Sequence, residues 1–395
     1  MSTSSVRHRR TLIAVGVAAI LATLGAALFA GPASARKGGP KAKVMTRNLY
    51  LGADLTPGIE AQTFNDLVDA AGTILNQVDD NKFQVRARGL ATEILRKKPD
   101  LVGLQEAALW RDAPCGSPFL PPQATHVRKG GDFLGLLLDQ LNADGKQYRL
   151  VVEQPEFDFE TPANTDGSPD HSCDIQGRLT MRDAILARAH AGVKTSYAQS
   201  GHFDTLLQVR VSGLPVDVTR GWTAVDAQVG NGPSFRFVNT HLEAFDNQQS
   251  NQTNQGTTVG NGKVRKAQAL ELIATDGPAN PPPELGMPAV LLGDLNSDVK
   301  TQLKPGDGAA DWQLLKAGFA ERSTRDPLSC CLNADVLRVG DGGDVSQFDH
   351  KVDHIMTNDP GHIRRGRTAV TGRRPHNGFW DSDHAGLFTA LKFHR

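Results

Sequence analysis

The stretch Leu101-Val102-Gly103-Leu104-Gln105-Glu106 has the pattern of a short buried strand that ends on a carboxylate. A helical stripe over Phe83–Lys97 precedes it, and Pro99 separates the two elements because proline ends a helix. Apolar strands that end in a polar or charged side chain recur along the chain. In α/β proteins such strand ends gather along one edge of a sheet, where active sites are built.

Other segments extend this pattern on both sides. Lys43–Asn48 is predicted to be the first strand, because Val44, Thr46 and Asn48 share one face at period two. Later strands are expected at Tyr148–Val152, Ala184–Leu186, Ser234–His241, Ala289–Gly293, Val352–Met356 and Ala385–Lys392. Helices are expected at Phe64–Val78, Phe83–Lys97, Phe133–Leu141 and Lys263–Ala274. The irregular alternation favours a mixed-sheet α/β domain over a strict βαβ barrel.

Three segments have the composition of loops. Residues 107–129 contain several prolines, and residues 154–178 form an acidic, polar insertion. Residues 247–261 are rich in Gln, Asn, Gly and Thr, which predicts a mobile loop. The acidic segment Glu153–Asp174 would repel polyanions if it bordered a cleft. Binding of a structural Ca²⁺ is the alternative for the same carboxylates.

The N-terminus has the features of a secretory signal. Arg7, Arg9 and Arg10 precede the apolar run Leu12–Ala30, and small residues follow at 33–35. We therefore expect residues 1–35 to be a signal peptide and residues 36–395 to be one domain of a secreted protein. An uncleaved membrane anchor is the alternative, because the apolar run approaches spanning length.

Charge and cysteine content narrow the class of protein. Residues 1–35 hold three arginines and no acid, so the remaining 40 basic and 43 acidic residues give a formal charge of −3. This balance disfavours a strongly basic protein that wraps nucleic acid. An even cysteine count in an exported chain indicates disulfides, and the preferred pair is Cys115 with Cys173. Cys330 and Cys331 either bond to each other or pair elsewhere.

The chemistry-bearing residues follow the strand ends in order. Asp294 and Asn296 are two apart after the strand Ala289–Gly293, so both side chains can face one pocket. The matching segments along the chain are Thr46-Arg47-Asn48, Pro99 to Glu106, Arg182 to Leu186, Asn239-Thr240-His241, Gly293-Asp294-Leu295-Asn296, Lys351-Val352-Asp353-His354 and Ser382-Asp383-His384. In this order they resemble the endonuclease/exonuclease/phosphatase superfamily, which includes pancreatic deoxyribonuclease, inositol-polyphosphate phosphatases and secreted sphingomyelinases.

The resemblance covers nearly the whole chain from residue 43 and implies a fold, a metal and an activity. The implied fold is an α/β/β/α sandwich of four layers with two mixed β-sheets. The implied cofactor is Mg²⁺, with Mn²⁺ as the alternative, held by Glu106 together with Asn48 and Asp383. By the same resemblance, His384 would contact the phosphate and Asp353 would orient its ring.

The remaining site residues are assigned in the same way. Asp294 would orient or deprotonate the attacking water, helped by Asn296. His241 would donate a hydrogen bond to a phosphoryl oxygen or protonate the leaving group. Arg182 and Asn239 are expected to bind the substrate. Together these groups meet the needs of metal-assisted in-line hydrolysis of a phosphodiester.

We therefore expect an exported, Mg²⁺-dependent phosphoric ester hydrolase. Its substrate would be a phosphodiester, either nucleic acid or a phospholipid head group of the sphingomyelin kind. The alternatives are a phosphomonoesterase acting on a small or inositol-type phosphate and a catalytically inactive binding module on the same fold. We expect a monomer with no obligate protein partner.

Overall fold

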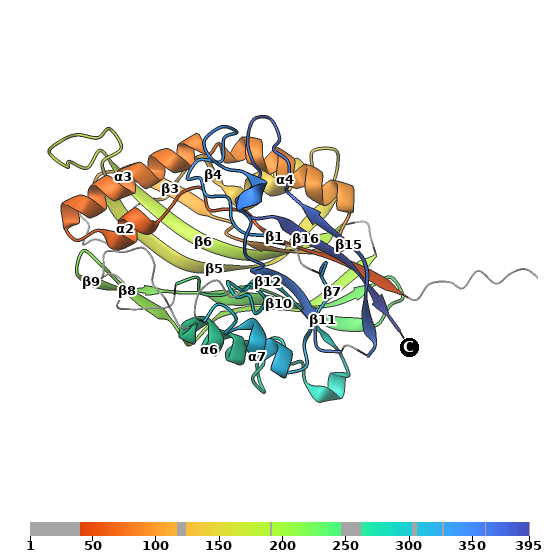
Figure 1. Ribbon diagram of the computed structural model, residues 1–395. Coiled ribbons are helices and arrows are strands. Elements are labelled where there is room, and N and C mark those ends of the chain that lie inside the picture. The colour runs from red at the N-terminus through yellow and green to blue at the C-terminus, as the bar shows by residue number, and fades with distance from the viewer. Residues whose placement is uncertain are drawn as a thin grey trace, which may run out of the picture. The chain divides into compact units, whose positions relative to one another are not determined.

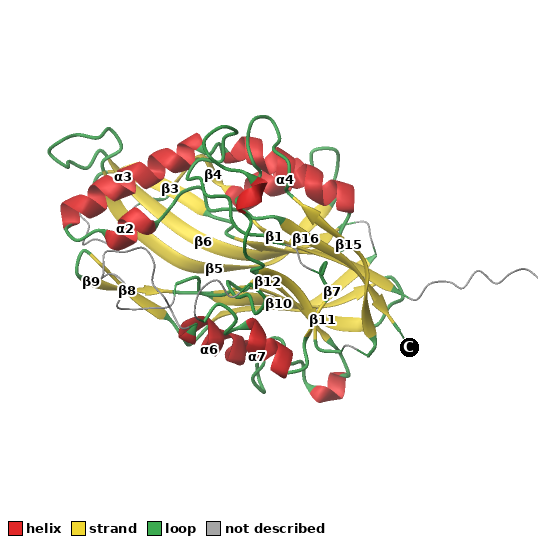
Figure 2. Cartoon of the chain, in the orientation of Figure 1, coloured by secondary structure: helices red, strands yellow, loops and turns green. Residues whose placement is uncertain are grey.

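The computed structural model describes residues 40–116, 124–189, 192–245, 262–301, 306–325, 328–359 and 361–394. Figures 1 and 2 show two β-sheets stacked face to face, with helices on both outer faces. The predicted four-layer α/β/β/α arrangement is therefore confirmed. The expected signal peptide and the loop predicted at 247–261 lie outside the described residues.

The first sheet has eight strands in the order β15-β16-β1-β2-β6-β3-β4, with β5 paired to β6. The strands β1 and β2 are parallel, and the other pairs are antiparallel. The bounds are β1 Lys41–Asn48, β2 Leu101–Gln105, β3 Leu109–Pro114, β4 His126–Asp132, β5 Tyr148–Ala163, β6 Ile175–Arg188, β15 Ile363–Thr371 and β16 Gly386–Phe393.

The second sheet has six strands in the order β13-β14-β12-β11-β10-β7, and only β11 and β12 are parallel among its described pairs. Its strands are β7 Val193–His202, β10 Gly221–Val229, β11 Ser234–His241, β12 Ala289–Asp294, β13 Ala320–Glu321 and β14 Asp353–Thr357. A separate hairpin joins β8 (Leu207–Val211) to β9 (Leu214–Val218). Both sheets are thus mixed, as expected.

Helices cover the outer face of each sheet (Figure 2). The first sheet carries α2 Thr56–Glu60, α3 Phe64–Asp80, α4 Phe83–Lys97 and α5 Phe133–Leu141, and the second carries α6 Lys263–Leu272 and α7 Asp311–Lys316. Two short 3₁₀ helices occupy Pro283–Leu285 and Val345–Gln347. Within the described part of the chain, no helix is both long enough and apolar enough to cross a membrane.

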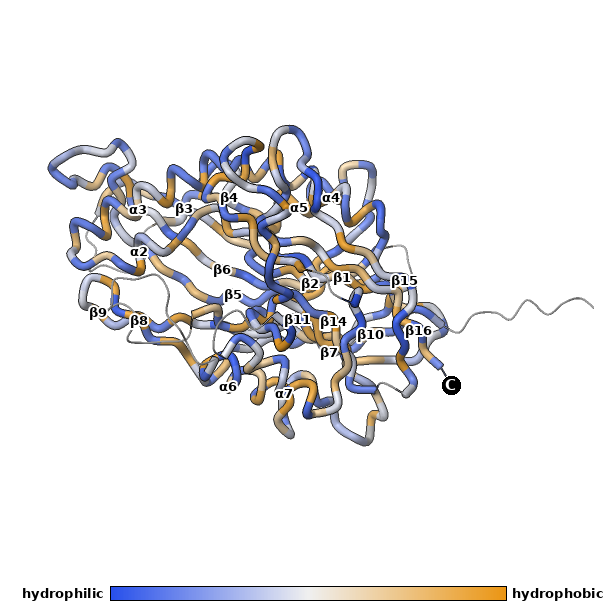
Figure 3. The backbone as a smooth tube through the Cα atoms, viewed as in Figure 1, coloured by the Kyte–Doolittle hydropathy of each residue, from blue (hydrophilic) through white to orange (hydrophobic). Residues whose placement is uncertain are grey.

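Apolar side chains form three layers between the four layers of backbone. Alternation along β1 places Val44 between the two sheets, with Phe235 and Leu292, and places Met45 against the helices, with Leu90. A third cluster packs the second sheet against α6 and α7. Figure 3 shows hydrophobic positions along the inner strands and hydrophilic positions on the outer turns. Period-two alternation thus produces both faces of a buried sheet.

Two loop predictions were wrong. Residues 107–129 contain β3 and the first part of β4, and most of the supposed insertion at 154–178 belongs to the long hairpin of β5 and β6. One acidic side chain of this hairpin has a charged partner on the opposite strand: Asp158 accepts a hydrogen bond of 2.8 Å from Nε of Arg178. A cross-strand partner makes a charge compatible with a strand, but the local composition does not reveal it.

The disulfide prediction is confirmed. Cys115, directly after β3, is bonded to Cys173, which precedes β6, with a Cα–Cα distance of 6.0 Å. The open question about the other two cysteines is also answered, because Cys330 is bonded to Cys331.

Candidate active site

Strand direction brings the first site residues together. Because β1 and β2 are parallel, Asn48 at the end of β1 and Glu106 just after β2 lie at the same edge of the first sheet. In the second sheet β11 and β12 are parallel, and His241 is in register with Asp294. A Cβ on Gly293 would lie 1.9 Å from the carbonyl oxygen of Thr240, so the absence of a side chain allows this close approach.

Two antiparallel strands supply the other half of the cluster. Asp353 begins β14 and is in register with Asp294. Asp383 and His384 directly precede β16, which is antiparallel to β1. The C-terminal ends of β1, β2, β11 and β12 and the N-terminal ends of β14 and β16 therefore meet at one edge of the stacked sheets. Residues near both ends of the described chain meet there.

Glu106 and Asn296 share a backbone feature. Their φ angles are +54° and +46°, in the left-handed region that residues other than glycine rarely adopt. Such strained residues cluster at functional sites. The backbone of Asn296 also closes a turn, because its N–H donates to Oδ1 of Asp294 at 2.9 Å. Its side-chain amide donates to the carbonyl oxygen of Leu242 at 2.9 Å.

Asn48 links two carboxylates. Its Nδ2 donates to Oε1 of Glu106 and to Oδ2 of Asp294, each at 3.1 Å. Its Oδ1 accepts the backbone N–H of Tyr50 at 2.9 Å, and Oε2 of Glu106 accepts the N–H of Leu51 at 2.7 Å. The first turn after β1 therefore holds both side chains in place, and Asn48 acts here as a bridging donor.

Asp383 completes the acidic side of the site. Burial, with a smaller contribution from the charge of Glu106, raises the pKa of Asp383 to about 6, against the opposing effect of His384. Both Glu106 and Asp383 are half-buried, in contrast to their fully buried neighbour Asp294. Two neighbouring carboxylates that repel each other at a partly open position are suited to hold a cation.

His384 is charged through its contacts with carboxylates. Its Nδ1 lies 3.0 Å from Oδ2 of Asp353, and its Nε2 lies 3.7 Å from Oδ2 of Asp294. Burial would lower the pKa of His384, but Asp353, Asp383 and Asp294 outweigh burial and hold that pKa well above the usual value. Burial raises the pKa of Asp294 to about 7. The cluster therefore combines an imidazolium with a carboxyl that titrates near neutrality.

Burial, together with Arg220, which precedes β10, keeps His241 neutral. Burial, followed by the charges of Arg220 and His384, lowers the pKa of His241 well below its usual value. The Arg220 guanidinium can only donate and lies 3.2 Å from Nδ1 of His241. The ring proton is therefore on Nε2, which lies 3.6 Å from Oδ2 of Asp294. This geometry favours a hydrogen-bond donor over an acid for the leaving group.

The two predicted substrate ligands lie outside this cluster of contacts. Arg182 donates to the carbonyl oxygens of Ala107 and Ala108, at 2.8 and 3.2 Å, and forms an ion pair with Asp132. It therefore holds the turn that follows Glu106. Asn239 is fully buried between the sheets, where its amide donates to backbone carbonyls and to Thr223, and its Oδ1 accepts from Gln105. These contacts give no support to substrate binding by Asn239.

Sequence reasoning missed a pair of buried acidic residues close to His241. Oxygen atoms of Glu156 and Asp183 and a ring nitrogen of His241 all lie within 4.8 Å of one another. Burial raises the pKa of Glu156 to about 8 and that of Asp183 well above its usual value. Arg220 forms an ion pair with Glu243 at 3.4 Å and partly offsets these charges. No local signal marks this group, because its members come from separate strands.

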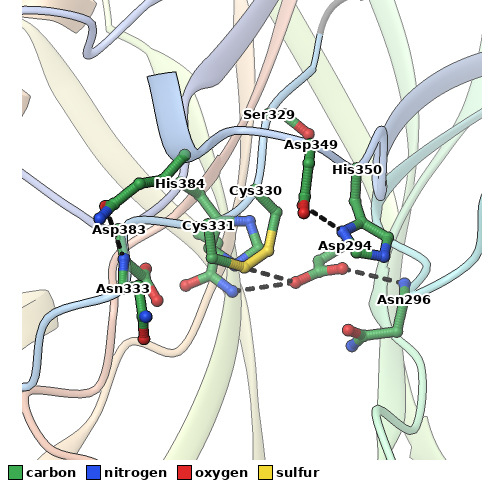
Figure 4. The surroundings of a disulfide bond; sticks show 12 residues. Asp294, Asn296, Ser329, Cys330, Cys331, Asn333, Asp349, His350, Asp383 and His384 are labelled. Atoms are coloured by element: carbon green, nitrogen blue, oxygen red, sulfur yellow. Dashed lines mark hydrogen bonds and ion pairs between the residues drawn. A yellow bond between two sulfur atoms is a disulfide. The ribbon is translucent and has the colours of Figure 1, made fainter. Parts of the chain in front are cut away.

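The Cys330–Cys331 disulfide borders the cluster. Figure 4 shows it beside the His384 ring. Sγ of Cys331 lies 3.8 Å from Nε2 of His384. The disulfide thus covers one side of the imidazolium.

Comparisons with known proteins address the fold. No protein-family model matches the sequence, and no curated protein matches it. An endonuclease/exonuclease/phosphatase family protein of known structure from Bacteroides thetaiotaomicron is 15% identical, with a TM-score of 0.50, over 90% of this chain and 99% of that chain. An endonuclease/exonuclease/phosphatase from Beutenbergia cavernae is 18% identical, with a TM-score of 0.48, over 89% of this chain and 72% of that one. The human Nocturnin catalytic domain is 15% identical, with a TM-score of 0.44, over 90% and 94% of the two chains.

Proposed function

We propose that this chain, whose fold is that of an endonuclease/exonuclease/phosphatase family protein, is a Mg²⁺-dependent phosphodiesterase. The observation that carries the proposal is the convergence of acid, amide and imidazole side chains at one edge of the stacked sheets. Asp294, Asp353 and His384 have ligand atoms within 4.8 Å of one another, and Asn48 links Asp294 to Glu106. An inactive binding module has no need of such a set of charges with shifted pKa values.

The donor set fits a hard divalent cation. Glu106 and Asp383 offer half-buried carboxylates, and carboxylate oxygens are the ligands that Mg²⁺ prefers. These two residues would hold the ion, with Asn48 positioning Glu106. When bound, the ion neutralises negative charge on the phosphoryl oxygens.

The chain's own residues supply the other requirements. Asp294, with its pKa near 7, accepts the proton of the attacking water, because a general base works best when its pKa lies near the working pH. The charged His384 faces the phosphate, and Asp353 fixes its Nδ1–H. The Nε2–H of His241 donates a hydrogen bond to a phosphoryl oxygen, which stabilises charge as it develops.

The test compares a diester with a monoester. Metal-stripped protein is assayed on bis-p-nitrophenyl phosphate and on p-nitrophenyl phosphate with Mg²⁺, Mn²⁺ or Ca²⁺, before and after EDTA. We expect metal-dependent hydrolysis that favours the diester and is lost in Glu106→Gln. The matched control is Asp144→Asn, an exposed carboxylate after α5, which should retain activity. Preference for the monoester would instead support a phosphatase, and inactivity with every metal would contradict the proposal.

Export belongs to the same proposal. The basic start and apolar run of residues 7–30 support a secretory signal, and the Cys115–Cys173 disulfide supports an oxidising compartment. N-terminal sequencing of protein recovered from the culture medium should give a chain that starts at Arg36. Recovery of the protein only in the cell fraction, with Met1 retained, would contradict export.

A further inference from the structure

An apolar pocket of about 130 Å³ lies beside the site. One wall comes from α2 and α3, and the opposite walls come from β5, β6 and the β8–β9 hairpin. Figure 1 shows these helices and the hairpin at the same end of the molecule. The lining side chains are mostly aliphatic or aromatic and include Leu67, Ile74, Phe159, Leu179, Val209 and Val216.

Two residues of the pocket lining connect it to the site. Arg220 lines the pocket and lies 3.2 Å from Nδ1 of His241. Trp110 also lines the pocket, and its indole N–H donates to the carbonyl oxygen of Leu51 at 2.8 Å. The N–H of Leu51 in turn donates to Glu106. If the phosphate of a substrate lies at the site, another part of the same molecule can therefore reach the pocket.

The lining determines what the pocket accepts. Thr161, Trp110 and Arg220 are the lining residues with strong hydrogen-bonding side chains, and the last two already have partners. A nucleobase would leave its polar edge without partners there, and a buried polar group without a hydrogen bond is costly. A hydrocarbon has no such cost. Since an engineered cavity of about 150 Å³ holds benzene, this pocket takes roughly five or six carbons.

We propose that this pocket receives the hydrocarbon chain of an amphiphilic phosphodiester whose phosphate occupies the site at Glu106, Asp294 and His384. The inference rests on the proposed function and narrows its substrate class to lipid phosphodiesters, in preference to nucleic acids. The β8–β9 hairpin belongs to neither main sheet, and its residues Leu207, Val209 and Val211 line the pocket. In this proposal the hairpin helps to bind the hydrocarbon chain.

A series of p-nitrophenyl alkyl phosphodiesters with methyl, propyl, hexyl and dodecyl groups tests the proposal. In the presence of Mg²⁺ we expect kcat/KM to rise roughly two- to fourfold per methylene and to level off near six carbons. Val209→Phe fills the pocket and should remove this gain while leaving the methyl ester unaffected. The control is Leu270→Phe on α6, because Leu270 is 45% exposed and lies outside the pocket.

A binding measurement separates the pocket from catalysis. Bromine quenches nearby indole fluorescence, so 6-bromohexyl phosphate, whose bromine reaches the depth expected of the sixth carbon, should quench Trp110 when it is added without metal, because Trp110 lines the pocket and is 3% exposed. Trp110→Phe should abolish that part of the quenching. This measurement also keeps the proposal testable if Val209→Phe fails to fold.

The outcomes are distinguishable. Hydrolysis of the methyl ester with no gain from longer chains would overturn the pocket proposal and leave the proposed function intact. Quenching of Trp110 without hydrolysis of any diester would support the pocket and overturn the proposed function. An equal gain from p-nitrophenyl thymidine phosphate would show that the pocket takes a nucleobase and would overturn the preference for a hydrocarbon chain.

Discussion

The substitution Asp353→Asn removes one charge from the centre of the site and changes almost nothing else. Oδ2 of Asp353 lies 3.0 Å from Nδ1 of His384, and the two residues are 0% and 5% exposed. Asparagine has nearly the same shape and keeps an oxygen that accepts the Nδ1–H. The variant therefore separates the charge of residue 353 from its hydrogen bond.

The expected effect follows from Coulomb's law. Two unit charges 3.0 Å apart attract by about 5 kcal/mol at an effective dielectric constant of about 20. That energy corresponds to a shift of at most about four units in the pKa of His384. Burial of the ring lowers its pKa, so without Asp353 the balance moves toward the neutral form. Loss of this charge beside the phosphate should slow hydrolysis roughly 100- to 1000-fold, as for other groups that stabilise developing charge.

The assay is metal-saturated hydrolysis of bis-p-nitrophenyl phosphate from pH 6 to 9, with the ring pKa of His384 followed by NMR. Asp349→Asn is the matched control, because Asp349 is hydrogen-bonded to His350 but its side chain is 62% exposed. The control should keep nearly full activity. A folded Asp353→Asn protein with more than half the activity and an unchanged His384 pKa would refute the reasoning.

Three further predictions follow from burial and cross-linking. The pKa of Glu156 is raised from 4.5 to about 8, so the folded state holds the proton and stability falls as pH rises through that window. As the pH rises from 5 to 9, the free energy of unfolding of Glu156→Gln should therefore increase relative to that of the wild type by on the order of 3 kcal/mol. Urea unfolding in the presence of EDTA measures this difference, and the control Glu153→Gln should show no such increase. Replacing Cys115 and Cys173 together by serine should lower the free energy of unfolding by about 4 kcal/mol in the same assay, because the bond closes a loop with a sequence separation of 58. An unchanged urea midpoint would contradict this prediction. Because the pKa of Asp383 is about 6, Mg²⁺ must displace a proton from this carboxyl below that pH. Calorimetry at pH 5.5 should therefore show weaker Mg²⁺ binding that is accompanied by proton release. Binding that does not depend on pH would contradict the assignment of Asp383 as a metal ligand.

Elements with local signals were predicted well. Ser234–His241 became β11 and Phe83–Lys97 became α4 with unchanged bounds, because a period of two or of 3.6 is visible in the residues themselves. Strands whose stability depends on a distant partner were missed. The polar part of β5 is a strand because it pairs with β6, which also places Arg178 against Asp158, and this pairing cannot be predicted from residues 154–163 alone.

The sequence alone determined which acid–base groups the protein has, their order, and their positions at the ends of apolar strands. These properties depend on residue type and on side-chain periodicity, both of which are local. Only the tertiary structure decided that Arg220 fixes the proton of His241, that Arg182 braces the turn after Glu106, and that a pocket adjoins the site. The physical reason is that burial and charge act through space, so pKa values, tautomers and cavities depend on neighbours far away in the chain.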